Sequence, residues 1–254
     1  MDLTGASAVV TGGASGIGEA SARQLAEKGA RCVIVDLNEE KGEAVAKDIG
    51  GLFAKADVAD EEQVQAAVDA AMEMGPLRAC VNGAGLGSAG RTVDRNGDPM
   101  PLKQFEFVIR VNLIGTFNCA SQSAAGMVAA DAVSEDGERG VIVNTASVAA
   151  FDGQIGQIAY SASKAGVAGM TLPMARDLSR SGVRVMTIAP GLFLTPMLAG
   201  LPEDVQKSLG AQVPFPSRLG NPSEYANLAA HIVANPMLNG EVIRLDGAIR
   251  MAPK

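Results

Sequence analysis

Short apolar segments rich in Val, Ile and Ala alternate with longer amphipathic segments along the whole chain. Such apolar segments are typical of strands buried on both faces of a parallel sheet. We expect strands over 7–11, 31–36, 51–56, 79–82, 141–145, 184–189 and 241–245. The intervening segments predict helices over 16–28, 39–49, 61–74, 102–129, 159–180 and 223–234. Since strands alternating with helices form right-handed crossovers, the pattern predicts an α/β fold with one doubly wound parallel sheet of about seven strands and helices on both faces.

No linker, low-complexity stretch or change of composition divides the 254 residues. Apolar residues make up 47% of the chain, which is enough for one large core and argues against disorder. We therefore expect a single Rossmann-like domain over residues 1–254.

Charge and cysteine content exclude several classes of protein. The net charge of −7 opposes nucleic acid or an anionic membrane as the main partner. Cys32, Cys80 and Cys119 are widely spaced within apolar segments, as buried thiols of a reducing compartment are, and the only histidine is His231. We therefore expect neither a disulfide framework nor a metal site. With no targeting segment and no apolar run of about 18 residues, a soluble, cytoplasmic protein is expected.

The first predicted strand runs into a glycine-rich turn, Thr11-Gly-Gly-Ala-Ser-Gly-Ile-Gly18, and a predicted helix follows. Glycines there let the backbone approach a pyrophosphate, whose charge the free N–H groups of a helix start can stabilise. A glycine-rich tight turn without a ligand is the alternative. Asp36, at the end of the second strand, favours a dinucleotide because a carboxylate there accepts hydrogen bonds from ribose hydroxyls and repels a 2′-phosphate. No Arg or Lys occurs over residues 11–22, so we expect NAD and not NADP.

Tyr160 and Lys164 lie four residues apart in the predicted helix 159–180, so their side chains share one helix face. A phenol with a pKa of about 10 is a poor base at neutral pH, and a nearby ammonium lowers that value. Ser147 follows the strand 141–145, at the carboxyl end where open α/β sheets bind ligands. The three together predict a site that moves a proton and a hydride at a carbonyl or alcohol carbon. Taken alone, the Tyr160–Lys164 pair could be a chance pair on an amphipathic helix, and Ser147 could be a loop or capping serine.

These motifs, with Asn82-Gly-Ala-Gly85, Asn112 and Pro190-Gly191, resemble the short-chain dehydrogenase/reductase family over the whole chain. The second half is similar to the family's branch of type II 3-hydroxyacyl-CoA dehydrogenases. The segments on which this similarity rests are 144–151, 160–164, 186–193, 213–220 and 239–251. The resemblance implies an NAD-dependent oxidoreductase of fatty acid metabolism that interconverts 3-hydroxyacyl-CoA and 3-oxoacyl-CoA, with steroids or other secondary alcohols as further substrates.

Two other functions stay open. A 3-oxoacyl-carrier-protein reductase usually uses NADP, which Asp36 opposes. A non-catalytic dinucleotide-binding scaffold is opposed by the complete set of Asn112, Ser147, Tyr160 and Lys164.

The resemblance also implies a role for each of these catalytic candidates. Ser147 would hold the substrate oxygen, Tyr160 would exchange the proton, and Lys164 would hold the nicotinamide ribose. Asn112 would position a water on Lys164, with a hydrogen-bonded core asparagine as the alternative. The cofactor would contact Gly12, Ser15, Gly16, Ile17, Gly18, Asp36, Asp57, Val58, Asn82, Gly83, Ala84, Tyr160, Lys164, Pro190, Phe193 and Thr195.

Residues 192–216 are rich in Leu, Met and Pro and predict a mobile apolar lid, since long irregular segments are usually functional. Met197, Leu198 and Leu201 would face the substrate there, together with Ser147 and Tyr160. A surface loop with a short helix is the alternative.

Two further features concern partners. Arg91 and Arg95, in the irregular stretch 86–101, would either meet coenzyme A phosphates or stay solvated. Small residues in helices 102–129 and 159–180 permit close helix contact. Relatives use the equivalent helices to assemble, which implies a homotetramer.

Overall fold

The computed structural model of the chain describes residues 1–253, with the side chain of Met197 excepted. Its centre is a seven-stranded sheet in the order β3-β2-β1-β4-β5-β6-β7, and all neighbouring strands pair in parallel. The predicted α/β, doubly wound fold is confirmed. The strands are β1 Ser7–Thr11, β2 Arg31–Asp36, β3 Leu52–Lys55, β4 Leu77–Asn82, β5 Gly140–Thr145, β6 Val183–Pro190 and β7 Val242–Leu245. The strand order reverses between β1 and β4, and a crevice opens at the carboxyl ends beside such a reversal.

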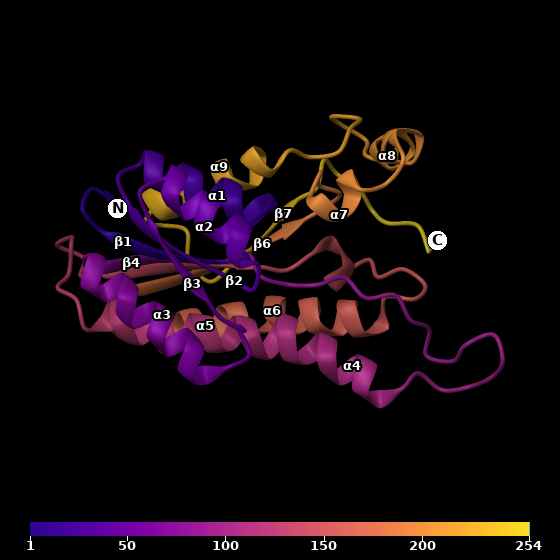
Figure 1. The fold of residues 1–254 in the computed structure, drawn as a ribbon, viewed down its shortest axis with the longest axis horizontal. Helices are drawn as coiled ribbons and strands as arrows, with labels where there is room; N and C mark the ends of the chain where they lie inside the picture. Colours follow the sequence, from indigo (N-terminus) through magenta and orange to yellow (C-terminus); the bar gives the residue numbers. More distant parts are fainter. Residues whose placement is uncertain (254) are drawn as a thin grey trace.

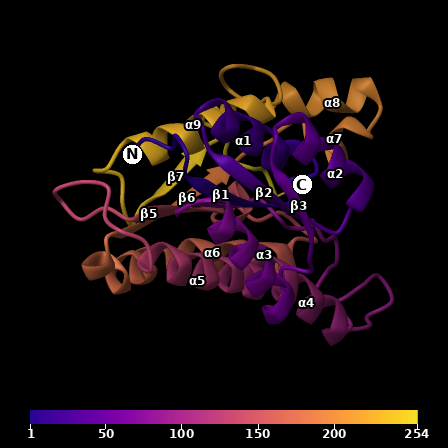
Figure 2. The same cartoon turned by 60° about the vertical axis from the view of Figure 1, so that its left-hand side comes forward.

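Helices cover both faces of the sheet (Figures 1 and 2). One layer holds α1 Gly16–Glu27, α2 Glu39–Asp48 and α9 Pro222–Ala234, and the other holds α3 Glu61–Met74, α4 Leu102–Ile109, α5 Gly115–Val128 and α6 Ile158–Asp177. Successive strand residues point to opposite faces. Val10 therefore packs in the cluster with Leu25 of α1, whereas Val9 packs in the cluster with Val68 of α3. Burial on both faces explains why the strands are continuous apolar runs.

The predicted helix over 102–129 is continuous but not uniform. A π-helical turn, Arg110–Ile114, joins α4 to α5 and carries Asn112. The Thr116 hydroxyl donates to the Asn112 carbonyl at 2.7 Å within this region. Such wide turns occur often at functional sites, and apolar periodicity does not reveal them.

The segment 192–216, predicted as an irregular lid, contains two short helices, α7 Pro196–Ala199 and α8 Glu203–Gly210. Glu203 and Asp204 occupy the first turn of α8, where the helix dipole favours negative charge. Both helices lie at one end of the molecule, the end toward which the chain runs after β7 (Figure 1).

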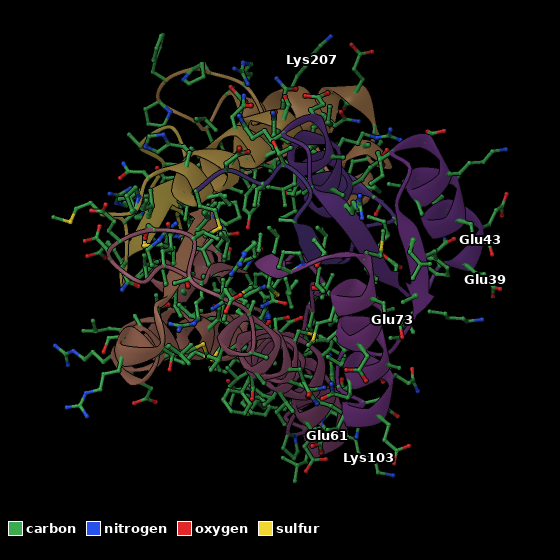
Figure 3. All side chains as sticks on the ribbon, turned by 90° about the vertical axis from the view of Figure 1, so that its left-hand side faces the viewer. Glu39, Glu43, Glu61, Glu73, Lys103 and Lys207 are labelled. Atoms are coloured by element: carbon green, nitrogen blue, oxygen red, sulfur yellow. The ribbon has the colours of Figure 1, made fainter. Side chains whose placement is uncertain are left out.

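Much of the negative charge lies on the outside of the molecule. Glu39 and Glu43 on α2, and Glu61 and Glu73 on α3, extend into solvent (Figure 3). None of the helices in the described part of the chain is long and apolar enough to cross a membrane. Among residues 1–253, no group of three or more His, Cys, Asp or Glu side chains could hold a metal ion.

Candidate active site

A cavity of about 970 Å³ lies at the carboxyl ends of the central strands. Most of the residues predicted to bind cofactor or substrate line it, although they come from segments far apart in sequence. On its wall are Gly12, Ser15, Gly16, Ile17, Asp36, Asp57, Val58, Gly83, Ala84, Ser147, Tyr160, Lys164, Pro190, Phe193, Thr195 and Leu198.

The glycine-rich turn after β1 has a backbone that requires glycine. Gly12 and Gly16 have φ angles of 64° and 57°, in the left-handed region that side chains disfavour. A Cβ on Gly12 would lie 2.7 Å from the backbone nitrogen of Ala84, and one on Gly18 would meet the Gly12 carbonyl. Gly18 is buried beneath the wall, so it serves packing within the turn. Ser15 precedes α1 without capping it through its side chain, so this backbone can accept a pyrophosphate.

Asp36 lies at the end of β2 with its carboxylate fixed at the rim of the cavity. Its two oxygens accept hydrogen bonds from the backbone nitrogens of Ala14, at 3.1 Å, and Asn38, at 2.9 Å. Asn82 differs from the prediction, because its side chain lies below the wall and donates to Asn144 at 2.9 Å. The small residues Gly83 and Ala84, which follow it, reach the cavity instead.

Ser147, Tyr160 and Lys164 are brought together on the cavity wall. Ser147 is buried just beyond β5, and its hydroxyl accepts a hydrogen bond from Ala149 N at 3.1 Å. Lys164 lies one turn after Tyr160 on α6, with its Nζ 5.9 Å from the centre of the Tyr160 ring. The same Nζ donates to the Thr145 carbonyl at 2.8 Å. A hydroxyl, a phenol and a buried amine thus face the same cavity.

Burial changes the pKa values of both Lys164 and Tyr160. Burial lowers the pKa of Lys164 to about 8, because the ammonium is removed from water. Burial also raises the pKa of Tyr160 above its ordinary value, although a hydrogen bond with Ser147 acts in the opposite direction. Desolvation of the phenolate is the larger of these two influences on Tyr160, and the Lys164 ammonium donates to the Thr145 carbonyl.

Asn112 lies behind the wall and connects two segments of the site. Its Oδ1 accepts from Leu86 N at 2.9 Å, and its Nδ2 donates to Leu86 O at 3.0 Å and to Ser163 Oγ at 3.1 Å. Ser163 in turn donates to the Tyr160 carbonyl at 2.7 Å. The amide therefore ties the loop after β4 to the turn of α6 that carries Tyr160.

The model of the family described as short chain dehydrogenase matches residues 6–206. The chain belongs to this family. It is 53% identical to the 3-hydroxyacyl-CoA dehydrogenase type-2 of Rattus norvegicus, over 99% of this chain and 97% of that protein. It is 54% identical to the protein of the same name from Drosophila melanogaster, over 99% and 100% of the two chains. A crystal structure of the type-2 enzyme from Mycobacterium avium superposes with a TM-score of 0.94 at 47% identity, covering 98% of each chain.

Membership of the short-chain dehydrogenases makes this protein an oxidoreductase with a nicotinamide dinucleotide cofactor. The structure fits such a group, because the crowded Gly12 turn, the uncapped start of α1 and the Asp36 carboxylate all border one cavity.

The candidate residues in the lid segment of this dehydrogenase fall into three groups. Phe193, Thr195 and Leu198 lie on the cavity wall. Leu201 was expected to face the substrate, but it lies off the wall and is 37% exposed, because it follows the end of α7 at the surface. The prediction for the Met197 side chain lies outside the described residues.

Several wall residues were missed by the sequence analysis. Gln154 and Gln157 line the cavity. Their position between Ser147 and Tyr160 in the chain was an available signal. Met251 also lines the cavity, but nothing in the local sequence pattern indicates where the segment after β7 will run.

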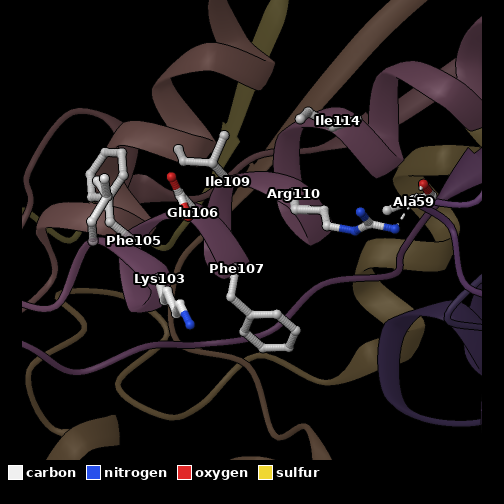
Figure 4. Close-up of a pocket in the computed structure, with 9 residues that line it drawn as sticks. Ala59, Lys103, Phe105, Glu106, Phe107, Ile109, Arg110 and Ile114 are labelled. Atoms are coloured by element: carbon white, nitrogen blue, oxygen red, sulfur yellow. Dashed lines mark hydrogen bonds between the residues drawn. The ribbon is translucent and has the colours of Figure 1, made fainter.

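A second hollow, of about 650 Å³, lies along α4 and contains none of the reactive groups (Figure 4). Its wall is largely apolar, with Phe105, Phe107 and Ile109 among its residues. Arg110 reaches the Ala59 carbonyl at 3.5 Å at one side. The larger cavity, which holds Ser147, Tyr160 and Lys164, is therefore the candidate active site.

Proposed function

We propose that this dehydrogenase interconverts 3-hydroxyacyl-CoA and 3-oxoacyl-CoA with NAD as its hydride carrier. The observation that carries the proposal is the 53–54% identity, over 99% of the chain, to relatives named for this activity. The cavity supports it as well, since Leu192, Phe193 and Leu198 give its lid side an apolar surface suited to an acyl chain. Steroids and other apolar secondary alcohols fit the same surface as further substrates.

The preference for NAD rests on Asp36. Its carboxylate is anchored by two backbone N–H groups, and no basic side chain among residues 1–253 bonds to it, so it stays available to ribose hydroxyls. A 2′-phosphate at that place would meet a fixed negative charge. The 3-oxoacyl-carrier-protein reductase reading is disfavoured for the same reason.

In this proposal Ser147 donates a hydrogen bond to the substrate oxygen, and Tyr160 gives the proton in reduction or removes it in oxidation. When bound, the nicotinamide supplies or accepts the hydride. Oxidation needs phenolate, which burial disfavours. Positive charge on Lys164, joined by that of the oxidised cofactor, must therefore offset the burial. Asn112 and Ser163 hold the Tyr160 turn in place during the transfer.

Coenzyme A would enter past the loop 86–101. Gly87, Ser88 and Ala89 of this loop line the cavity. Gly90 N donates at 2.7 Å to Gly156 O, within the loop that joins Ser147 to Tyr160. Arg91 and Arg95, farther along the loop, are exposed. Their charges support a role in meeting phosphates at the mouth of the cavity.

We also infer a homotetramer in the cytoplasm. Phe107, Ile114 and Phe117 are between 51% and 57% exposed on one helical run, and a large exposed apolar patch marks an interaction surface. The three cysteines are buried free thiols, as proteins of a reducing compartment have. Light scattering should give a mass four times that of the 25.9 kDa chain. A monomer would contradict the inference.

The function is tested by following NADH absorbance with acetoacetyl-CoA as substrate. We expect turnover that falls strongly when NADPH replaces NADH, and that is weaker with acetoacetyl-acyl-carrier protein. Turnover with NADPH and the carrier-protein thioester alone would favour the reductase. Dinucleotide binding without turnover of any thioester or steroid would favour a scaffold.

A further inference from the structure

The segment after β7 returns to the active-site cavity. Met251 lies on the cavity wall, next to a loop, Val148–Gln157, that joins Ser147 to Tyr160. Backbone and side-chain bonds fix this contact, because Ile155 N donates to Pro253 O at 3.0 Å and Gln154 Nε2 donates to Ala252 O at 2.9 Å. This segment, residues 246–253, is called the tail below. It borders the side of the cavity where the loop between Ser147 and Tyr160 lies, which is the substrate end in the proposed function.

An ion-pair clasp holds the tail against this loop. Arg244 of β7 donates from Nη2 to Asp152 at 2.6 Å and from Nε to Asp246 at 2.7 Å. The guanidinium also lies 5.5 Å from the Phe151 ring centre and donates to the Ile249 carbonyl at 2.9 Å.

The hydrogen bonds hold the chain on both sides of Met251. Arg244, which pairs with Asp152, donates to the Ile249 carbonyl before it, and Gln154 donates to the Ala252 carbonyl after it. Asp152 and Arg244 are both largely buried, with side chains 18% and 21% exposed, so this pair is shielded from solvent more than an ordinary surface pair. The backbone of Met251 is thus held at one place beside the loop that carries Gln154.

We propose that Met251 sets the length of acyl group that the cavity accepts, and that the Arg244–Asp152 clasp is the positioning device that holds it there. The proposal rests on the proposed 3-hydroxyacyl-CoA activity. A methionine side chain is long and adaptable, so at the substrate end of a cavity it limits the depth available to an acyl chain. One methylene in an apolar pocket changes selectivity by about tenfold or more.

The test measures kcat/KM with NADH for 3-oxooctanoyl-CoA and for acetoacetyl-CoA, and uses the ratio of the two. Met251→Ala should raise the ratio about tenfold by deepening the pocket, and Met251→Phe should lower it. Asp152→Asn should raise the ratio by a smaller factor, with the affinity for NADH unchanged. Met237→Ala is the matched control, because Met237 is 90% exposed and lies away from the cavity, and it should leave the ratio unchanged.

Opposite shifts for the two Met251 variants separate a specificity role from a structural one. If both variants lower both activities equally, or leave the ratio at the wild-type value, the proposal is overturned while the 3-hydroxyacyl-CoA activity stands. If the wild-type enzyme turns over neither thioester, the proposed function fails and this inference fails with it.

Discussion

Two buried cations, at opposite ends of the sheet, differ in how many hydrogen-bond partners they have. Arg184, near the start of β6, donates to Glu138 at 2.8 Å and to the carbonyls of Ile232, Val233 and Leu238 at 2.8 to 3.0 Å. Lys164, beside the carboxyl end of β5, donates one hydrogen bond that the structure records within residues 1–253, to Thr145. Both side chains are almost completely buried.

The difference in hydrogen-bond partners indicates that the two ends of the sheet serve different purposes. At the amino end, the buried charge has a carboxylate partner and joins the end of α9 to β6, so it serves stability. At the carboxyl end, burial lowers the pKa of Lys164 to about 8, and an ammonium has three donors, so donors remain for a ligand. The proposed function places binding and proton transfer at this carboxyl end, where the buried charge comes at some cost in stability.

Among the changes that compare the two ends of the sheet, Lys164→Met has the largest expected effect. Activity with acetoacetyl-CoA should fall at least about 100-fold, because the charge that supports proton transfer is gone. The free energy of unfolding in urea should stay constant or rise, since an apolar side chain replaces a buried charge of similar shape. Lys207→Met is the control, because Lys207 is 75% exposed and pairs with Glu203 on the surface of α8. A strongly destabilised Lys164→Met protein would remove the contrast with Arg184.

Arg184→Met tests the other end of the sheet. Removal of the Arg184 guanidinium leaves Glu138 and three carbonyls without their donor. The free energy of unfolding should therefore fall by about 3–5 kcal/mol. The value of kcat per folded molecule should stay near that of the wild type. Urea unfolding and active-site titration measure the two quantities, and Arg180→Met, at an exposed position, is the control. Loss of kcat in a stable protein would show that this end also serves catalysis.

Two carboxylates give a smaller contrast of the same kind. Glu138 pairs with Arg184, whereas Asp36, within the part of the chain that the structure describes, accepts only backbone hydrogen bonds and stays available to a ligand. Asp36→Ala should reduce the preference for NADH over NADPH by about tenfold, or ~1.4 kcal/mol. Dissociation constants of both dinucleotides measure it. An unchanged preference would mean that another residue selects the cofactor.

The smallest expected effect is in the pH dependence of cofactor binding. Lys164 is protonated below its pKa of about 8, so its contact with the cofactor should be complete below that pH and weaken above it. The dissociation constant of NADH should therefore rise severalfold as the pH passes through about 8. In Lys164→Arg it should stay level, since a guanidinium does not lose its proton there. A level profile in the wild type would contradict the assigned pKa.

The fold and the carboxyl end of the sheet were predictable because their signals are local. Continuous apolar strands, the Gly12 turn and the Tyr160–Lys164 spacing each follow from a few adjacent residues. The π-helical turn around Asn112 was missed, because it leaves the apolar pattern of a helix unchanged. The raised pKa of Tyr160 was missed because it depends on burial by distant segments.

Contacts between segments far apart in sequence were equally hidden. Neither the position of Met251 on the cavity wall nor the four hydrogen-bond partners of Arg184 can be derived from local patterns.

The central claim is that Tyr160 exchanges the proton with the substrate oxygen beside the bound dinucleotide. The most direct test is the rate of NADH oxidation by Tyr160→Phe with saturating acetoacetyl-CoA, at matched NADH occupancy and in a protein of wild-type stability. The account predicts a loss of about 10²–10⁴-fold in kcat, because the variant keeps the ring and lacks only the hydroxyl. A Tyr160→Phe enzyme that keeps most of the wild-type kcat would contradict it.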